Sequence, residues 1–560
     1  MRKIGLVILL ITILIAGCKT PSYWLKEAPI AEVNGDIITF EDMKRSFEKG
    51  HGGHGAFLED LTMNKQYLQK VIDKQLLVQE GLRIGLDEDE DIQEIIKNSR
   101  DSKLVEEFYT NEIVKKVNVS EDEIKDAFEK SKNLYKVLYI LVENEEEGRK
   151  ALERVNEGED FEKVASEVSI HESKARGGKL GFVMWGVMNE EIENALLGMK
   201  EGEIKGPFKT EDGWAIVKVT AVEPQDKVEY EKVRDELRNK VYKRKLEKLK
   251  KSYFEDLRNK YNVKIYDSMI EPIFLSDDNE IIEKKKDEVL VSADGFQFTV
   301  EDIRKLINFK KLNRYPKTHR ADLIEDLINN KIDNKLLVLE AEKKGYDKKP
   351  EILKYEKRIR DSLVGQKLLA TVIARDLEVS EEEMKDYYEK HKDKYILPEK
   401  VLLSAILVDD ENKANEIKKK LEEGADFAEI AKKESKDASG VNGGQVGWFA
   451  KNELRPSVVG KIFDLKENEI MLAKEKEGYY ILKVTKRQEE RQLGFDEVKD
   501  RVRNDVYKKK YNDRVKEWTS KLRENAEIDI HNWNLRKATK VYIKENYERK
   551  ERMNKKGGGH

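Results

Sequence analysis

The sequence predicts an α+β chain of several domains, arranged as two tandem units, and three observations support this fold class. The chain of 560 residues contains one sequence pattern twice. The first half of each repeat has the periodicity of amphipathic helices, and the second half adds β-branched runs between helical segments. The matching segments are Val119-Ser120-Glu121 with Val379-Ser380-Glu381, Phe161 with Phe427, Gly177-Gly178 with Gly443-Gly444, and Val241-Tyr242 with Val506-Tyr507.

The two repeats are long and differ by a short insertion. Their offset rises from 379 − 119 = 260 to 427 − 161 = 266, so we place the insertion in the second repeat, at 391–399. Solenoid repeats are roughly 20 to 50 residues long. The sequence therefore indicates a duplicated multidomain unit, in a chain with room for several domains of roughly 100 to 200 residues each.

The composition excludes some classes of protein. Charged residues make up 39% of the chain and hydrophobic residues another 39%, and the net charge is only −4. A nucleic-acid surface needs a basic patch of one sign, so we expect no nucleic-acid partner. Because the apolar residues recur with helical or strand periods, the chain is not a disordered polyelectrolyte.

Residues 1–17 predict a lipoprotein signal peptide. Two basic residues precede an apolar run at 4–15, which is shorter than the 20 or so apolar residues of a membrane span. The segment Ile15-Ala16-Gly17-Cys18 resembles the lipobox of bacterial lipoproteins, in which the cysteine receives a lipid and becomes the new N-terminus. Cys18 is the single cysteine of the chain, so lipidation explains it better than a disulfide does. An uncleaved signal anchor is the alternative.

These features predict that the protein is located in the cell envelope. A lipid on Cys18 would hold the protein on a membrane in an extracytoplasmic position, facing the periplasm. Two or more acyl chains anchor a protein stably, whereas one gives only marginal binding. Because Lys19 follows the cysteine in place of the Asp that often marks inner-membrane retention, the outer membrane is slightly favoured.

The first half of each repeat is a helical module, at 18–134 and at 286–399. Each module begins with a short strand and a turn, followed by a helix with a capping box, two long amphipathic helices and a further capped helix. Neither module contains a residue cluster suited to bond-making chemistry. The expected features are, in the first module, a strand at 30–34, the pair Thr39 and Asp42, helices at 66–84 and 91–117, and Ser120; in the second, a strand from 289, the pair Thr299 and Asp302, helices at 322–344 and 351–376, and Ser380.

The second half of each repeat is a small domain, at 135–224 and at 400–489. Each domain begins with a β-branched, apolar strand that we expect to be buried, and ends with another strand after a glycine-rich stretch. A segment with a long charged helix and a short strand then closes each repeat, at 225–275 and 490–531, and a basic tail occupies 532–560. The expected strands and helices are 137–142, 214–219, 230–261 and 263–266 in the first repeat, and 401–408, 479–484, 495–525 and 527–531 in the second.

Both small domains resemble parvulins, the small peptidyl-prolyl isomerase domains. In the second repeat the resemblance rests on Asp426-Phe427-Ala428-Glu429-Ile430-Ala431, Ser435-Lys436-Asp437 and Gly443-Gly444-Gln445-Val446-Gly447-Trp448-Phe449; in the first it is looser and rests on Asp160-Phe161, Ser169-Ile170-His171 and Gly177-Gly178-Lys179-Leu180-Gly181-Phe182. With the helical segments around them, the repeats resemble the SurA and PrsA chaperone families of bacterial envelopes. The resemblance implies that each repeat is a helical chaperone module with an inserted parvulin-like domain of the FKBP-like β-α-β type.

The resemblance also locates the catalytic positions of the family. Parvulins are thought to use two histidines around an Asp or Cys to lower the rotational barrier of the prolyl bond, which is about 18 to 20 kcal/mol. Both histidine positions are substituted in both repeats, and alanine has no side-chain hydrogen bond to offer. We therefore expect weak or absent isomerase activity, with the two tyrosines as packing residues. The equivalent positions are Tyr139, His171 and Ala215 in the first repeat, and Ala405, Asp437 and Tyr480 in the second.

A proline-binding groove would remain after this loss. The resemblance places its apolar residues at Leu180, Met188 and Ile192 in the first repeat, and at Val446, Phe449, Leu454 and Val458 in the second. Burial of apolar surface contributes about 25 cal/mol per Å², so such a groove still favours proline and aromatic side chains. For Leu180 and Val446 a role in the domain core is equally compatible with the sequence.

The sequence therefore predicts a lipid-anchored envelope chaperone or foldase that binds unfolded or proline-containing polypeptides and uses no cofactor. The duplication suggests a pseudo-dimer within one chain, with the two helical halves facing a shared crevice. The alternatives are a working prolyl isomerase that uses Asp437 and Tyr480, and a docking lipoprotein with one dedicated partner. We predict no metal site, because His51-Gly52-Gly53-His54 has no further ligand at a convincing spacing and is more typical of a linker.

Overall fold

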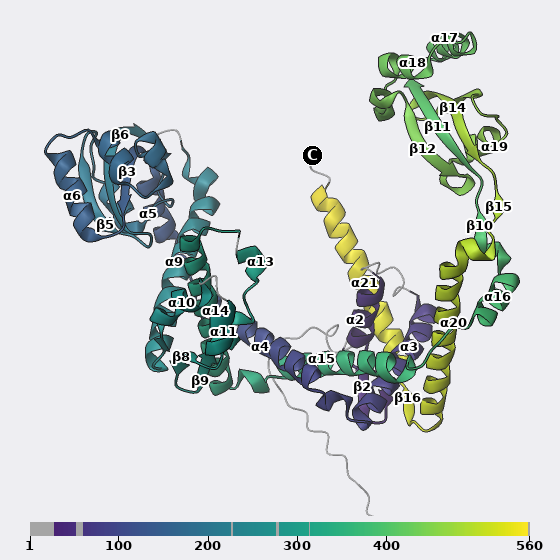
Figure 1. Ribbon diagram of the computed structural model, residues 1–560, viewed down its shortest axis with the longest axis horizontal. Helices are drawn as coiled ribbons and strands as arrows, with labels where there is room; N and C mark the ends of the chain where they lie inside the picture. Colours follow the sequence, from purple (N-terminus) through teal and green to yellow (C-terminus); the bar gives the residue numbers. More distant parts are fainter. Residues whose placement is uncertain (1–26, 52–59, 226–227, 276–278, 313, 558–560) are drawn as a thin grey trace, which may run out of the picture. The chain divides into compact units, whose positions relative to one another are not determined.

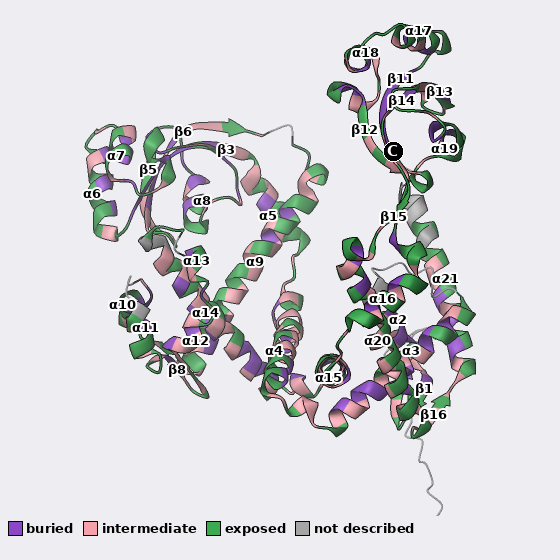
Figure 2. Cartoon of the chain, turned by 45° about the vertical axis from the view of Figure 1, so that its right-hand side comes forward, coloured by how far each residue is buried: buried purple, intermediate pink, exposed green. Residues whose placement is uncertain are grey.

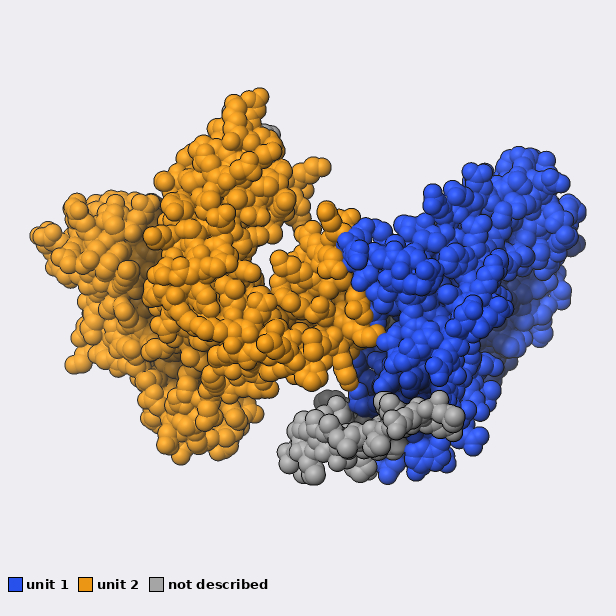
Figure 3. Space-filling model, turned by 90° about the horizontal axis from the view of Figure 1, so that it is seen from below, with its two compact units in different colours: residues 1–89, 361–560 blue, residues 90–360 orange. Residues whose placement is uncertain are grey.

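The computed structural model of the chain describes residues 27–51, 60–225, 228–275, 279–312 and 314–557 (Figure 1). The predicted signal peptide, Cys18 and most of the His51 to His54 segment lie outside these ranges. The described residues fall into two compact units (Figure 3): unit 1 consists of residues 1–89 and 361–560, and unit 2 of residues 90–360. Each unit therefore contains residues of both repeats.

The short sheets of the helical modules show how the repeats are combined. In unit 1, β16 (Ile528–Ile530) pairs antiparallel with β1 (Pro29–Val33), which pairs with β2 (Asp36–Thr39). In unit 2, β7 (Lys264–Ile265) pairs with β8 (Val289–Ala293), which pairs with β9 (Phe296–Thr299). The strand that ends one repeat thus joins the hairpin that begins the other.

This pairing corrects the expected domain organisation. The repeats follow one another along the sequence as predicted, but the segments 18–134 with 225–275 and 286–399 with 490–531 do not form self-contained bodies. The chain exchanges the beginning of each helical module between the two compact units. The two copies have nearly the same sequence pattern, so the pattern alone does not say which hairpin a closing strand will select.

The helical core of unit 2 joins one long helix of each repeat. Phe108, Leu257 and Ile332 are buried together, and they come from α4, α9 and α14 respectively. Arg258 of α9 donates to Asp333 of α14 at 2.6 Å, which ties the two repeats together at the edge of this core. The helices of unit 2 outside its β-rich domain are α4 (Glu90–Glu112), α5 (Glu121–Ser131), α9 (Tyr230–Lys260), α10 (Ile270–Phe274), α11 (Asn279–Lys285), α12 (Val300–Arg304), α13 (Phe309–Leu312) and α14 (Lys317–Lys343).

The helical core of unit 1 includes the segment that was predicted as a basic tail. Residues 532–557 form a helix, α21, and its residues Leu535 and Ala538 are fully buried against β1 and α3. The apolar spacing of these residues outweighs the charge of the segment. The helices of this region are α2 (Phe40–His51), α3 (Leu61–Arg83), α16 (Glu381–Lys390), α20 (Phe495–Glu524) and α21 (Asn532–Gly557). The helix α15 (Pro350–Leu368) belongs to unit 1 from residue 361 onwards, and a π turn, η7 (Leu369–Ile373), follows it.

The predicted capping boxes are present and have equivalent partners in the two units. Ser120 and Glu123 cap α5, and Lys245 of α9 binds the same Glu123 at 2.6 Å. Ser380 and Glu383 cap α16, and Lys510 of α20 binds Glu383 at 2.6 Å. In each unit the long charged helix is therefore fixed to the helix that precedes the β-rich domain.

Each β-rich domain contains a four-stranded antiparallel sheet, of order β4-β3-β6-β5 in unit 2 and β12-β11-β14-β13 in unit 1. Two helices cover one face of each sheet and one helix covers the other, and buried residues are concentrated on the central strands (Figure 2). The elements are β3 (Asn133–Val142), α6 (Glu145–Asn156), α7 (Phe161–Val168), β4 (Lys179–Val183), α8 (Glu190–Leu196), β5 (Ile204–Lys209) and β6 (Trp214–Pro224) in unit 2, and β11 (Lys400–Val408), α17 (Glu411–Glu422), α18 (Phe427–Glu434), β12 (Gln445–Ala450), α19 (Pro456–Ile462), β13 (Ile470–Glu475) and β14 (Gly478–Gln488) in unit 1.

The expected buried strands and closing strands are present, whereas β4, β5, β12 and β13 were not predicted. Glycine and proline within β4 and β5 lower their strand propensity, and these edge strands are stabilised by their neighbours. Short 3-10 turns complete the structure at η2 (Leu86–Glu88), η3 (Val114–Lys116), η4 (Glu172–Arg176), η5 (Asp267–Met269), η6 (Tyr346–Lys348), η8 (Lys392–Tyr395), η9 (Ala438–Asn442) and η10 (Lys451–Glu453).

The predicted insertion at 391–399 contains η8 and β10 (Ile396–Leu397). Strand β10 pairs antiparallel with β15 (Arg491–Gln492), and the two strands form a ribbon at the entrance of the second β-rich domain. Tyr395 is completely buried beside α16 and α20. The ribbon lengthens both connections of this domain, whereas β3 of the first domain begins two residues after α5 ends.

Candidate functional site

The first β-rich domain contains an open cleft of about 1230 Å³ at the predicted groove. The cleft is lined by Tyr139, His171, Leu180, Met188 and Ile192, which are five of the six positions expected for the first repeat. Ile192 reaches the cleft from the buried face of α8, and Leu180 and Met188 are half-buried. Ala215, the sixth position, is fully buried in the same apolar cluster, on β6.

A glycine fixes the loop that follows His171 against Tyr139. Gly178 has a φ of +80°, and its carbonyl accepts a hydrogen bond from the backbone nitrogen of Tyr139 at 2.8 Å. A Cβ at this position would lie 2.5 Å from the Tyr139 carbonyl oxygen, so only glycine fits. Ser169 holds the preceding loop, because its hydroxyl accepts from the backbone nitrogen of Leu141 at 3.1 Å.

The side chain of His171 caps a 3-10 turn. Its Nδ1 accepts from the backbone nitrogen of Ser173 at 3.1 Å and lies 2.8 Å from the Ser173 hydroxyl. An unprotonated Nδ1 leaves the proton on Nε2. The ring packs edge-to-face against Tyr139, with 5.0 Å between the centroids.

Tyr139 has a weakly acidic phenol at the position where the resemblance places one of two histidines. Burial, and to a smaller extent the nearby carboxylate of Asp212, raises the pKa of Tyr139 to about 12. The phenol therefore stays neutral at physiological pH. By the resemblance, the two histidine positions of this domain are therefore a phenol, Tyr139, and an alanine, Ala215, and His171 stands at the Asp position.

The second domain arranges Ala405, Asp437 and Tyr480 in the same way. Gly444 takes the role of Gly178, since its carbonyl accepts from the backbone nitrogen of Ala405 at 2.7 Å. Oδ1 of Asp437 accepts from the backbone nitrogen of Ser439 at 2.8 Å and from its hydroxyl at 2.6 Å. Burial, followed by the carboxylate of Asp437, raises the pKa of Tyr480. Asp437 is thus the cap of its 3-10 turn, as His171 is in the first domain.

The apolar positions of the second domain differ in exposure. Phe449, Leu454 and Val458 pack in one cluster with Ala405 and Tyr480. Val446 is 46% exposed, so it does not complete the core. Val458 is buried, and Phe449 and Leu454 are half-buried.

A buried carboxylate that the sequence analysis missed fixes one wall of the first cleft. Glu193 of α8 is 4% exposed, and its Oε1 accepts from the backbone nitrogens of Gly186, Val187 and Met188 at 2.8 to 2.9 Å. Its Oε2 accepts from Arg244 of α9 at 2.6 Å.

Arg244 links this carboxylate to the long helix α9, and we call the contacts of Glu193, Arg244 and Trp185 the clamp. Its guanidinium lies 4.7 Å from the ring centroid of Trp185, which packs against Leu237 and Val241 of α9. The cleft continues along α9, where charged side chains line it from Arg244 to Arg258. Glu193 and Arg244 are 51 residues apart, and no periodicity connects them.

The second domain has no such clamp. By the same offsets, Glu193 corresponds to Val459, Trp185 to Lys451 and Arg244 to Lys509. Lys509 pairs with Asp513 on its own helix at 2.7 Å. The two domains therefore have different surroundings: the first is joined to α9 by Glu193 and Arg244, and the second is connected through the β10–β15 ribbon.

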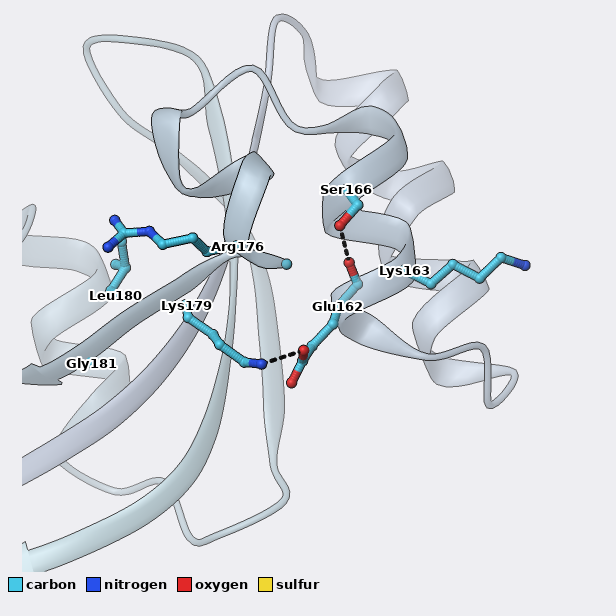
Figure 4. Close-up of a pocket in the computed structure, with 8 residues that line it drawn as sticks. Glu162, Lys163, Ser166, Arg176, Lys179, Leu180 and Gly181 are labelled. Carbon is cyan, nitrogen blue, oxygen red and sulfur yellow. Dashed lines mark hydrogen bonds and ion pairs between the residues drawn. The ribbon is translucent and has the colours of Figure 1, made fainter.

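A second hollow of about 780 Å³ lies beside β4 (Figure 4). Lys179 binds Glu162 across it at 2.6 Å, and the Ser166 hydroxyl donates to the backbone carbonyl of Glu162 at 2.8 Å. Lys163 and Arg176 point away from this pair (Figure 4). The polar groups do not converge on one point, and we assign no chemistry to this hollow.

Two general features of the described residues bear on function. Within the described ranges, no group of three or more His, Cys, Asp or Glu side chains could hold a metal ion. None of the helices in the described part of the chain has the length and apolar content of a membrane span.

Comparisons with known proteins give the family of the two β-rich domains. A family model described as a PPIC-type PPIASE domain matches residues 142–221, and another of the same description matches residues 379–500. The foldase protein PrsA of Geobacillus sp. (strain WCH70) is 30% identical over 272 residues, which are 47% of this chain and 92% of that protein.

Two solved structures are also similar. PrsA from Bacillus subtilis is 27% identical, with 45% of this chain and 98% of that chain covered and a TM-score of 0.16. A SurA-like chaperone of Campylobacter jejuni is 24% identical, with 42% and 96% covered and a TM-score of 0.28.

The fold, the site and the family models define a protein with two parvulin-type peptidyl-prolyl isomerase domains. The chain belongs to the PrsA foldase family, since it covers almost the full length of a PrsA relative at 30% identity.

Proposed function

We propose that this protein is a lipid-anchored, extracytoplasmic chaperone that binds extended segments of unfolded polypeptides and has weak or no isomerase activity. The observation that carries the proposal is the first cleft, which is open and has apolar residues in its lining, while Tyr139 and Ala215 stand at the two positions that the resemblance gives to histidines. Binding is retained in such a groove, whereas the hydrogen-bonded pair that the family uses for turnover is lost.

The anchor and the clients belong to the same proposal. A lipid on Cys18 would keep the chaperone in the envelope, facing the periplasm, with the outer membrane favoured. The clients would be secreted or outer-membrane polypeptides with exposed proline and aromatic residues. Two grooves on one chain raise the effective concentration for a client that binds both. The shared crevice between two helical halves stays a prediction.

Two activities measured on one purified sample test the proposal. We expect the protein to suppress aggregation of several unrelated unfolded proteins. In a protease-coupled assay with a proline peptide, we expect a rate close to that of buffer. A rate well above buffer that disappears in Asp437→Ala would favour the working isomerase, and capture of one stoichiometric partner without general holdase activity would favour the docking protein.

The groove itself is tested by Met188→Ser. A peptide that buries roughly 60 Å² of apolar surface against this side chain loses about 1.5 kcal/mol, or about tenfold in affinity. We expect a labelled proline-centred peptide to bind the variant about tenfold more weakly, as measured by fluorescence anisotropy.

Leu454→Ser is the matched variant in the second domain, and Met184→Ser is the control. Met184 is 44% exposed and does not line the cleft. Equal effects of Met184→Ser and Met188→Ser would mean that the peptide does not bind in the cleft.

A further inference from the structure

The outer face of α21 carries a stripe of basic and aromatic side chains. Trp533, Lys537, Lys540, Lys544 and Tyr547 are exposed and are spaced by three or four residues, which places them on one side of the helix. Trp533 is 63% exposed and Tyr547 65% exposed. Arg536 and Ile543 flank the stripe and are also exposed.

The opposite face fixes the orientation of the helix. Leu535, Ala538 and Tyr542 are buried in the core of unit 1, and the Thr539 hydroxyl accepts from the side-chain amide of Asn64 at 3.0 Å. Exposed residues are visible along α21 in Figure 2. Because these apolar residues bury one face of α21 in the core of unit 1, the basic and aromatic stripe on the opposite face points to solvent.

The charge of this segment departs from that of the chain. Residues 532–560 contain nine Lys and Arg and three Glu, an excess of six positive charges, while the whole chain has a net charge of −4. On α20, for comparison, the exposed Lys521 pairs with Glu517 along the helix. On α21 the cation Lys537 instead lies over the ring of Trp533, at 4.5 Å from the centroid.

The first turn of α21 lies beside the start of the first strand. The side-chain amide of Asn534 donates to the Pro29 carbonyl at 2.7 Å, and the backbone nitrogen of His531 donates to the Ile30 carbonyl at 2.9 Å. Cys18 precedes Pro29 by 29 − 18 = 11 residues, which span at most about 40 Å. The 26-residue helix α21 is about 39 Å long, which is close to the greatest distance that the chain can span between Cys18 and Pro29.

We propose that α21 is a second membrane contact, whose outer face binds the surface of an anionic bilayer. Lysine and arginine side chains are attracted to anionic headgroups, and tryptophan and tyrosine favour the boundary between headgroups and water. A lipid chain and a basic patch act together in stable anchoring. The position next to a lipid on Cys18 rests on the proposed function, whereas the charge and the aromatic stripe do not.

Vesicle binding tests this proposal. The protein used begins at Lys19, carries no lipid and keeps every described residue. We expect it to cosediment with vesicles that contain phosphatidylglycerol at least tenfold better than with pure phosphatidylcholine, and to lose this binding as salt is raised.

The matched variants remove equal charge from two places. The α21 variant is R536Q/K537Q/K540Q/K544Q, and the control is K419Q/K432Q/K433Q/K461Q, four exposed lysines of α17, α18 and α19. Each cation near an anionic surface contributes a factor of roughly five, so the α21 variant should lose at least tenfold in binding. The control should lose less than twofold, and both should keep the circular dichroism of the parent.

Brominated lipids give a second readout. Trp533 should be quenched in anionic vesicles, with the effect absent in Trp533→Phe and kept in Trp448→Phe. Equal losses in the α21 variant and the control, or no preference for anionic lipid, would overturn the proposal. Tighter binding of soluble polyglutamate or a nucleic acid than of vesicles through the same residues would overturn it in favour of another partner.

The chaperone proposal and the membrane-contact proposal are tested by different measurements, so the failure of one can be told from the failure of the other. The α21 variant should suppress client aggregation as well as the parent does. If the parent binds vesicles but no clients, the chaperone proposal fails and the membrane contact stands. If Cys18 carries no lipid in cells while α21 binds vesicles, only the anchor fails.

Discussion

At the residue scale, two glutamates of unit 2 show how single side chains position the first cleft and join the repeats. Glu193 is nearly inaccessible to solvent, and it satisfies three backbone nitrogens and one guanidinium. Glu112 of α4, from the first repeat, accepts from Lys344 at 2.7 Å and from Tyr346 at 3.0 Å, both from the second. Neither role is recognisable in a sequence that is rich in glutamate.

We expect Glu193→Gln to loosen the loop that carries Met188. Glutamine keeps an acceptor for the backbone nitrogens but loses the charge that Arg244 faces, and hydrogen bonds to charged groups contribute about 1 kcal/mol more than neutral ones. The first parvulin domain should lose about 1 to 2 kcal/mol in stability, and amides at 185–189 should exchange faster by hydrogen–deuterium exchange.

The control for this change is Lys509→Gln, at the position that corresponds to Arg244. Lys509 makes an exposed pair with Asp513 along α20, so its loss should leave both domains unchanged. Unchanged exchange at 185–189 in Glu193→Gln would contradict the clamp. A peptide-binding assay on the same variant shows whether the clamp also shapes the groove.

The contacts of Glu112 predict an acid-sensitive link between the repeats. Lys344 first, then Lys116, lowers the pKa of Glu112 from 4.5 to about 2. Because the folded value is the lower one, the stabilisation is complete above about pH 5 and is lost as the pH falls from 4.5 towards 2. Solvent reaches the pair, so we expect a contribution of about 1 kcal/mol.

The measurement compares hydrogen exchange in α4 and α14 between the parent and Glu112→Gln. At pH 6 the variant should exchange faster, and the difference should shrink towards pH 3. A difference that stays constant with pH would show that Glu112 contributes by packing and not by its charge.

At the element scale, most helices and buried strands follow from the sequence. The capping boxes at Thr39, Ser120, Thr299 and Ser380 are local, so sequence and structure agree on them. The edge strands β4 and β5 were missed because they depend on neighbours distant in sequence. The prediction of a basic tail at 532–560 rests on the charge of the segment. The spacing of Leu535, Ala538 and Tyr542 is that of a buried helical face, and the structure follows this spacing.

The candidate site was predictable where the family pattern constrains it. Tyr139, His171, Leu180, Met188 and Ile192 line one cleft, as the resemblance implied. Glu193 and Arg244 were not predictable, because a buried ion pair between distant residues leaves no periodic signal. The partners of the closing strands were not predictable either, since each could select between two similar hairpins.

The packing of α3 on α15 gives a prediction at this scale. A Cβ on Gly81 would lie 2.5 Å from Cγ1 of Val364, and the stiff valine side chain has little room to move. In unit 2 the corresponding residues are Ala341 and Leu104, so alanine is accepted there with a different partner.

We expect Gly81→Ala to lower the stability of unit 1 by about 1 to 2 kcal/mol, because overpacking outweighs the gain of about 1 kcal/mol in helix propensity. Val364→Ala should relieve the clash, so that the double variant is more stable than the two single changes predict. Urea unfolding of the four proteins measures this coupling. Additive effects would mean that the helices separate without strain.

At the scale of the whole molecule, the exchange of segments makes the two repeats mutually dependent. Unit 1 takes β1, β2, α2 and α3 from the first repeat and α20, β16 and α21 from the second. Unit 2 takes α4 and α9 from the first repeat and β8, β9 and α14 from the second. Both helical cores therefore need both repeats, whereas each parvulin domain lies within one repeat.

The contacts across the exchange are specific in both units. In unit 1, Arg523 donates to Asp73 at 2.5 Å and to the Gln69 carbonyl at 3.0 Å. In unit 2, Glu340 accepts from Lys260 and, at 2.7 Å, from the Tyr261 hydroxyl. Glu340 is 4% exposed, and a buried charge without its partners is strongly unfavourable, so an isolated repeat would leave this carboxylate unpaired. The side chains of Arg523 and Asp73 are 30% and 34% exposed, so the loss of that pair would cost less.

Cleavage of the chain between the repeats tests this dependence. With a specific protease site inserted between Asp277 and Asp278, we expect the two fragments to elute together in native gel filtration after complete cleavage. They should separate only in denaturant, and each fragment alone should aggregate or pair with a second copy of itself. Self-contained tandem repeats would instead be released as two folded monomers, and that elution profile would falsify the exchanged arrangement.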